Sequence, residues 1–469
     1  MENEFGAGRA GGLRLGRRRA EARGASRSLM LLAMTLGFVV VQLDVTVVNV
    51  ATKTIGASVG GSISVLQWVV NAYTLSFAAT ILTAGALGDR VGAKRVFIVG
   101  FALFTVASLG CGLSPSLAFL IAARTLQGFG AAILVPCSLV LLNHSYDNDQ
   151  ERSRAVGIWA SGASVAIAVG PIVGGVLIHL LGWRSIFYIN VPIGALGIWL
   201  SWRYARETPA ARNRSLDIPG QVTAMLALGL LAAALILGGK QGWDSGVVIG
   251  GFVCFAFFLT LFLLIESKIS QPMLPLNLFR NGVFSATSML GLFLNISAYG
   301  FLFILSLYWQ QLRGYSPLMT GLCFLPWMCA VFPANLLAPK VAEKTGVRWT
   351  IVIGEAIFLA GCVFLLRLEE KTPFASMVAP LVAIGAGLGL VVPPMTTAML
   401  GSVDKRQSGI ASGVLNSMRQ TGSVVGVALF GSLISGKNHL LQGLHLSLVI
   451  TVAMAGLSIG AAIWGIRDK

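Results

Sequence analysis

Long apolar segments dominate the pattern of hydrophobic and polar positions along the chain. Each is about 18 to 25 residues long, the length that an α-helix needs to cross a hydrocarbon core of about 30 Å. Short polar or charged stretches separate them. The pattern predicts fourteen membrane-spanning helices, at residues 29–51, 66–88, 96–113, 117–142, 154–178, 184–202, 218–239, 246–265, 283–307, 317–339, 349–366, 374–399, 408–435 and 446–466.

The composition supports this pattern. Of 469 residues, 55% are hydrophobic and only 11% are charged, although the net charge is +16. A soluble nucleic-acid-binding protein would carry charge nearer the usual level of about 25%. A soluble chain as apolar as this one would expose far more than the few hundred Å² that a monomer tolerates. We therefore expect an all-α integral membrane protein.

The distribution of Lys and Arg predicts the orientation. An even number of spans places both termini on one side, and with that side cytoplasmic, 25 of the 34 Lys and Arg residues lie in cytoplasmic segments. This bias is the usual signal for orientation. We expect the inner (cytoplasmic) membrane, with both termini cytoplasmic. Residues 1–28, which are rich in Arg, Gly and Ala, are expected to form a basic disordered tail that contacts anionic lipid or only enforces topology.

The cysteines and histidines carry no recognisable site. All six Cys lie in apolar segments without CxxC spacing, and the four His lie at span ends without an HExxH or a Ser-His-Asp group. The glycines at 385, 387 and 389 are not followed by the Lys-Ser/Thr of a nucleotide loop. We therefore expect no metal, no cofactor, no enzymatic activity and no ATP-driven pump.

An internal repeat divides the chain. The loop GALGDRVGAKR corresponds to PKVAEKTGVRW at an offset of 254, GFGAAILVP to GAGLGLVVP at 257, and three span-5 glycines to span-13 glycines at 252. The repeat predicts two parallel six-helix bundles, at residues 29–203 and 283–469, and a linker at 204–282 that contributes two additional helices. Repeats of this kind place a transport site near the bilayer midplane.

Seven stretches carry a resemblance to a known family. They are LDVTVVNVA (43–51), GALGDRVGAKR (85–95), RTLQGFGAAILVP (124–136), GPIVGG (170–175), WRSIFYINVPIG (183–194), RGYSPLMTGLCFLP (313–326) and SGIASGVLNSMRQTG (408–422). With them the sequence resembles the major facilitator superfamily from about residue 30 to its end. Within the superfamily it is most similar to the 14-span drug:proton antiporters, a family of quaternary-ammonium and antibiotic exporters that includes methylenomycin-resistance-like proteins. The resemblance implies alternating access driven by a proton gradient.

Four ionisable residues lie within predicted spans, where a charge costs roughly 2.5 to 3.5 kcal/mol. They are Asp44, Arg124, Glu355 and Arg419. A carboxylate that alternates between a proton and a cationic partner is the simplest exchanger, and an arginine cannot release its proton. The resemblance implies that Asp44 and Arg124 carry proton coupling; the alternative is a purely structural pair.

The sequence is less specific about the roles of the other two intramembrane charged residues. Glu355 lies near the start of span 11, so we expect a structural role in which it reaches back to Lys344 or Arg348. Arg419 corresponds to Ile167 in the repeat, and we expect it at the interface between the bundles, with substrate contact as the alternative.

Two groups of residues predict conformational elements. In the loop after span 2, a carboxylate can meet the positive end of a neighbouring helix, such as the start of span 13 near Ser408, and latch one state; the alternative is a topology signal. Glycines and a proline in span 5 permit close approach and bending, or serve generic packing. The gating loop contains Gly85, Gly88, Asp89, Arg90, Gly92, Lys94 and Arg95, and the span-5 group contains Gly162, Gly170, Pro171, Gly174 and Gly175.

The resemblance implies a substrate cavity between spans 1, 4, 9 and 12. Candidate polar contacts are Gln42, Asn49 and Asn295, and candidate apolar walls are Trp68, Phe293 and Met395; aromatic side chains facing lipid are the alternative. We expect a monomeric, proton-coupled exporter of small amphipathic or cationic drugs or antibiotics. The alternatives are a metabolite exporter or uptake permease without drug resistance, and a membrane sensor that transports nothing.

Overall fold

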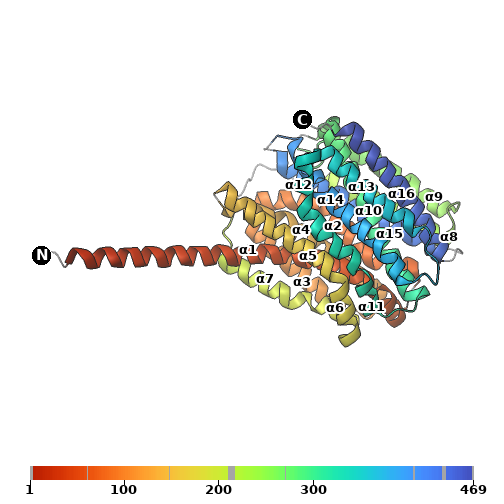
Figure 1. Ribbon diagram of the computed structural model, residues 1–469, viewed down its shortest axis with the longest axis horizontal. Coiled ribbons are helices and arrows are strands. Elements are labelled where there is room, and N and C mark those ends of the chain that lie inside the picture. The colour runs from red at the N-terminus through yellow and green to blue at the C-terminus, as the bar shows by residue number, and fades with distance from the viewer. Residues whose placement is uncertain are drawn as a thin grey trace.

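The computed structural model describes residues 4–60, 62–146, 148–209, 217–269, 271–404, 407–435 and 440–466, with the backbone alone for residues 4–25. Helices account for nearly all of these residues, and none of the described ranges contains a strand. The helices are α1 Glu4–Val59, α2 Ile63–Val91, α3 Ala93–Gly112, α4 Leu117–Ser145, α5 Asp149–Leu181, α6 Ser185–Tyr188, α7 Asn190–Tyr204, α8 Ile218–Gln241, α9 Gly246–Lys268, η1 Leu276–Arg280, α10 Gly282–Leu307, η2 Tyr308–Leu312, α11 Pro317–Cys323, α12 Leu325–Thr345, α13 Val347–Leu365, α14 Phe374–Gly401, α15 Ser408–Ser435 and α16 Leu440–Gly465 (Figure 1).

Each predicted span coincides with a helix or with two consecutive helical segments. Within the described ranges, 13 helical segments are long and apolar enough to cross a membrane. The remaining predicted span is α15, a helix of 28 residues that carries Asn416, Arg419 and Gln420. It packs against α2, α8 and α10 inside the bundle, so its polar residues face protein rather than lipid. The predicted all-helical membrane architecture is confirmed.

The first helix begins well before the first predicted span. Residues 4–28 continue α1 as a helix that projects from the bundle (Figure 1), and the predicted disorder of the basic tail stays a prediction. Ala, Leu, Arg and Glu have high helix propensity, and span 1 already supplies the costly first turn from which a helix can extend.

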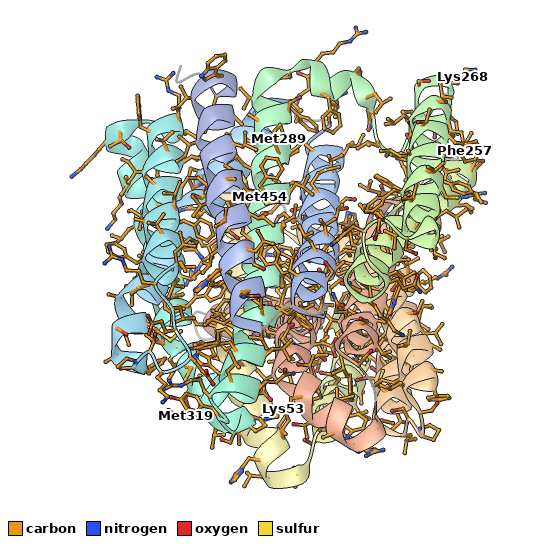
Figure 2. The ribbon with its side chains drawn as sticks, turned by 90° about the vertical axis from the view of Figure 1, so that its right-hand side faces the viewer. Lys53, Phe257, Lys268, Met289, Met319 and Met454 are labelled. Atoms are coloured by element: carbon orange, nitrogen blue, oxygen red, sulfur yellow. The ribbon has the colours of Figure 1, made fainter. Side chains whose placement is uncertain are left out.

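The same packing pairs recur in the two halves. In the first half α1 packs against α5, α2 against α4, and α3 against α4; in the second half α10 packs against α15, α12 against α14, and α13 against α14. These pairs are equivalent under the internal repeat. Of the additional helices, α8 contacts both α2 and α15, whereas α9 packs on α8 and exposes Val253, Phe257 and Leu264 (Figure 2). The domain boundaries predicted from the sequence, at residues 203/204 and 282/283, stay predictions.

The two ends of the bundle differ in closure. We call the end that carries the loops at residues 92, 281 and 402 the terminal face, and the other end the opposite face. Lys268 lies at the terminal face, whereas Lys53 and Met319 lie at the opposite face (Figure 2). There Lys53 donates to the carbonyl of Gln310, and the Gln310 amide donates to the Val50 carbonyl at 3.1 Å. These bonds join α1 to η2 and thus hold the two halves together at the opposite face.

A second contact closes the opposite face between α5 and α11. A Cβ at Gly321 would lie 2.3 Å from the carbonyl oxygen of Pro171, and one at Gly175 would lie 2.7 Å from the Cα of Leu318. Only glycine permits this approach of two backbones. The opposite face is closed in this conformation, and a cavity of about 1030 Å³ lies near the terminal face.

Candidate functional site

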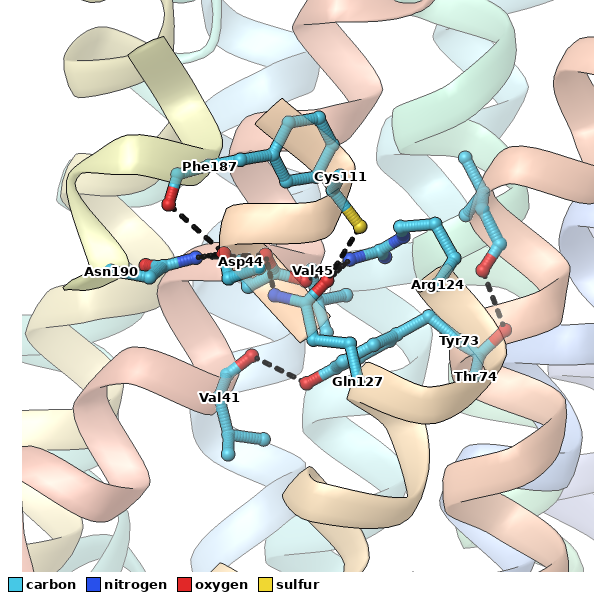
Figure 3. Close-up of polar contacts among 12 residues, drawn as sticks. Val41, Asp44, Val45, Tyr73, Thr74, Cys111, Arg124, Gln127, Phe187 and Asn190 are labelled. Atoms are coloured by element: carbon cyan, nitrogen blue, oxygen red, sulfur yellow. Dashed lines mark hydrogen bonds and ion pairs between the residues drawn. The ribbon is translucent and has the colours of Figure 1, made fainter. Parts of the chain in front are cut away.

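Asp44 and Arg124 form an ion pair in the first half of the molecule. Asp44 is on α1 and is 2% exposed; Arg124 is on α4 and is fully buried. The guanidinium Nη1 donates to Asp44 Oδ2 (Figure 3). The structure thus brings together the two residues that the sequence predicted for proton coupling, although that role itself stays a prediction.

Amides complete the hydrogen bonding of the Asp44 carboxylate. Gln127 Nε2 donates to Oδ1 at 2.9 Å, and Asn190 Nδ2 donates to the same oxygen at 3.1 Å. Gln127 also accepts from Arg124 Nη1 at 2.8 Å, so it bridges both members of the pair. A buried charge is tolerated only when it is paired and hydrogen-bonded, and here both carboxylate oxygens have donors (Figure 3).

The far side of the arginine is equally enclosed. Arg124 Nε donates to the carbonyl of Val69 at 3.0 Å, and its guanidinium carbon lies 4.2 Å from the centre of the Tyr73 ring. The Tyr73 hydroxyl in turn donates to the Val41 carbonyl at 3.2 Å. The arginine is therefore held by a carboxylate, a carbonyl and an aromatic face. Protonation of Asp44 would remove the strongest of these interactions, which gives the pair two states that differ by one proton.

Sequence reasoning missed Gln127 and Asn190. Both lie in stretches that carried the family resemblance: Gln127 follows Arg124 by three residues and so lies on the same helix face, and Asn190 is a polar residue inside an apolar span. Asn190 also donates to the Ser108 hydroxyl at 3.0 Å, and Ser108 donates to the Phe187 carbonyl at 2.9 Å. An amide within an apolar span is the signal that would have pointed to Asn190.

The gating loop turns at Gly92, whose φ is +112°. Glu207 accepts from the backbone N–H groups of Lys94 at 2.9 Å and Arg95 at 3.3 Å, and so caps the start of α3. The sequence predicted a different contact of this kind, in which the Asp89 carboxylate meets the N-terminal end of span 13. Asp89 lines the same cavity as Gln407 and Ile410 beside α15, but its proposed latch contact stays a prediction. The other loop residues lie at the terminal face, where Gly85 approaches Pro136, Gly88 approaches Cys137, and Arg90 lies in the last turn of α2.

We expect Glu207→Ala to lower the free energy of unfolding by about 1 kcal/mol, because it removes a carboxylate cap from the α3 N-terminus. The measurement is the thermal unfolding of purified protein in detergent. Glu343→Ala, which removes an exposed carboxylate at the end of α12, is the control and should change the midpoint little. Equal midpoints for the two variants would contradict the capping role.

The span-5 glycines lie against two different helices. Cβ atoms at Gly162 and Gly170 would meet Thr35 at 2.5 Å and Thr46 at 1.9 Å on α1. A Cβ at Gly174 would lie 3.0 Å from Val47, also on α1, whereas Gly175 and Pro171 face α11. The residues therefore permit the close approach that the sequence predicted, and their role in antiport stays a prediction.

The six predicted substrate-binding residues do not form one wall. Gln42, Asn49, Asn295 and Met395 are buried, and the amides of Asn49 and Asn295 each donate to a carbonyl of their own helix, at 2.8 Å. Trp68 packs in a cluster that contains Leu235 of α8 and Ala428 of α15, and Phe293 packs against the large core cluster that extends through both halves. None of the six lines the cavity of about 1030 Å³.

That cavity lies between the terminal ends of α2, α4 and α15 and the segment after α9. Its wall includes Trp159 and Met273. Asp217 and Glu266 also line it, but they are 4% and 3% exposed, and their Oδ2 and Oε1 atoms both point to the space beside Gly220. Its volume suits a drug-sized solute, for which pockets of about 300 to 1,000 Å³ are typical.

The two remaining intramembrane charges lie in the second half. Glu355 is 2% exposed, and its Oε1 has no hydrogen-bond partner among the described residues. The expected reach of Glu355 to Lys344 or Arg348 stays a prediction. Arg419 is half-buried on α15 beside Gly291 of α10, close to Tyr299.

The described residues contain no group of three or more His, Cys, Asp or Glu that could hold a metal ion.

Comparison with known proteins identifies the family. The sequence profile of the Major Facilitator Superfamily matches residues 34–427. The chain belongs to the major facilitator superfamily. The predicted family and fold are confirmed, and the superfamily consists of transporters rather than enzymes.

Relatives and solved structures agree with this assignment. The Methylenomycin A resistance protein of Bacillus subtilis is 39% identical over 407 residues, which cover 86% of this chain and 87% of the relative. The protein of the same name from Streptomyces coelicolor is 34% identical over 443 residues, covering 94% and 93%. Multidrug resistance protein Stp of Mycobacterium tuberculosis is 36% identical, covering 87% and 76%. A bacterial homologue of the lysosomal transporter Spinster, in an inward-facing, unoccupied conformation, has a TM-score of 0.62 at 17% identity, covering 94% of this chain and 97% of that one.

Proposed function

We propose that this major facilitator superfamily member expels small amphipathic drugs or antibiotics from the cytoplasm in exchange for protons. The names of its relatives, which include resistance proteins for methylenomycin A and for multiple drugs, support efflux. The observation that carries the exchange mechanism is the buried Asp44–Arg124 pair with its amide partners. It is a carboxylate at membrane depth whose only ionic partner in the described structure cannot give up a proton.

The geometry suggests how the exchange proceeds. With the carboxylate ionised, Arg124 holds α1 to α4, the opposite face is closed, and the cavity is near the terminal face. When a proton from the other side neutralises Asp44, the ionic interaction is lost and the first half can change its packing on the second. Release of that proton restores the pair. One carboxylate then connects proton movement to the direction in which the cavity opens.

We infer that the cavity opens to the cytoplasmic side. Of the 34 Lys and Arg residues, 25 lie in the two termini and in the loops on the side that the positive-inside rule assigns to the cytoplasm. We therefore assign both termini to the cytoplasm and the protein to the cytoplasmic membrane, as a monomer. In this conformation a solute would enter from the cytoplasm or the inner leaflet.

The test is transport in everted membrane vesicles from a host that lacks its own drug pumps. With an imposed proton gradient, vesicles that contain this protein should accumulate members of an amphipathic drug panel, and a protonophore should abolish the accumulation. Accumulation that survives the protonophore would contradict proton coupling. A panel in which no compound accumulates, together with unchanged drug sensitivity of the cells, would contradict drug efflux.

A further inference from the structure

Arg419 differs from the other intramembrane charges in its surroundings. Asp44, Arg124 and Glu355 are each no more than 2% exposed, whereas Arg419 retains accessible surface although it lies near the middle of α15. In the described part of the chain its guanidinium has no hydrogen bond or ion pair, and Tyr299 is the only ionisable group in electrostatic contact with it. An arginine cannot become neutral by losing a proton, so a guanidinium at this depth requires an electron-rich partner.

Arg419 lies where the two halves meet. Its Cγ is 3.4 Å from the Cβ position of Gly291 on α10, so the absence of a side chain there leaves room for the arginine stem. Tyr299 follows Gly291 by eight residues on α10. It packs against both large core clusters of the molecule. It also lies near Gln42 on α1. The guanidinium is therefore near the junction of α1, α10 and α15, at the depth where superfamily members with internal repeats bind their solutes.

The charges nearby leave Arg419 uncompensated. Asp44 is neutralised by Arg124, with both carboxylate oxygens already bonded to donors. Asp217 and Glu266 face one another at the terminal end and are almost completely buried, so they present little negative charge to a solute. The amide of Asn295, which is nearest along α10, donates to its own helix. A cationic solute at the junction would meet a like charge, whereas an anionic group would supply the missing partner.

We propose that Arg419 binds an anionic group of the transported solute, a carboxylate or a group of similar charge and geometry, so that the preferred cargo is an amphipathic anion. A planar guanidinium offers paired N–H donors that match a carboxylate. This inference rests on the proposed efflux function and sharpens its substrate class, because amphipathic cations become the disfavoured ligands. Tyr299 lies beside the guanidinium and can offer its hydroxyl to a neutral part of the solute.

The test compares three probes that share one apolar body. They are 4-phenylbutyrate, its uncharged amide, and 4-phenylbutylamine, and their binding to the purified full-length protein is measured by calorimetry at pH 7. We expect the carboxylate to bind at least about tenfold more tightly than the amide, the ratio typical of a hydrogen bond to a charged group, and the amine to bind most weakly. Tighter binding of the amine than of the carboxylate would overturn the proposal.

Substitutions of Arg419 test whether this residue causes the preference for the carboxylate probe over the amide. Arg419→Gln should abolish the preference for the carboxylate while leaving amide binding unchanged, and Arg419→Lys should retain part of it. Arg367→Gln, which removes an exposed arginine after α13, is the control and should behave as wild type. An unchanged carboxylate preference in a folded Arg419→Gln protein would contradict the proposal. If the Gln variant does not fold, a Lys variant that binds the carboxylate as weakly as the amide would contradict it instead.

The outcome is separable from that of the proposed function. Selective carboxylate binding without proton-driven accumulation in vesicles would refute the antiport mechanism and leave the anion site intact. Proton-driven accumulation of cationic but not anionic panel members would support efflux and refute the anion site.

Discussion

Asp44→Asn is expected to abolish proton-driven efflux and to lower the stability of the protein. The substitution removes the group that would carry the proton and leaves Arg124 buried without a counter-charge. Breaking a buried ion pair by removing one partner typically costs about 3–5 kcal/mol. The measurements are drug accumulation in everted vesicles and the thermal unfolding midpoint of the purified variant.

A double variant separates the two effects. Asp44→Asn with Arg124→Gln removes both charges, so it should recover much of the lost stability while efflux remains absent. Glu151→Gln is the matched control, because Glu151 pairs with Arg27 at 3.2 Å on the surface, where such a pair contributes about 0–1 kcal/mol. Full gradient-driven efflux by Asp44→Asn would remove Asp44 from the mechanism.

Gly321→Val is expected to open the contact between α5 and α11 and to shift the protein away from the conformation described above. A Cβ at this position would lie 2.3 Å from the carbonyl oxygen of Pro171 and 2.9 Å from its carbonyl carbon, and backbone atoms of a packed helix cannot move aside singly. We expect a shift of at least about tenfold in the equilibrium between conformations, which corresponds to about 1.4 kcal/mol. The readout is labelling of a cysteine introduced at Leu318, in a cysteine-free background, by a membrane-impermeant reagent added at the opposite face.

Gly456→Val serves as the control for this substitution, since a Cβ there has no heavy atom within 4 Å. Its labelling rate at position 318 should match that of the parent protein. Equal labelling rates for Gly321→Val and the parent would show that the α5–α11 contact does not hold the opposite face closed.

The sequence predicted the spans well because the bilayer imposes a strict relation between length and hydrophobicity. Even α15, which contains Asn416, Arg419 and Gln420, was placed correctly from its apolar residues, and its glycines match those of α5 through the repeat.

Asp44 and Arg124 were predictable because a charge within an apolar span is costly and therefore conspicuous. Gln127 and Asn190 were not, because an amide costs less to bury and only its geometry shows that it bonds a carboxylate. The candidate pocket was the weakest part of the prediction. Trp68 packs in a cluster with residues of α8 and α15. The helix α8 contacts both α2 and α15, and no local sequence pattern specifies that docking.

Substrate-driven proton movement in liposomes tests the central claim most directly. Purified protein is reconstituted with a pH-sensitive dye inside the liposomes, the membrane potential is held at zero, and a transported drug gradient is imposed. The account predicts that wild-type protein moves protons against the drug flow and that Asp44→Asn moves none. Drug flux through the wild-type protein without proton movement, or equal proton movement through Asp44→Asn, would contradict it.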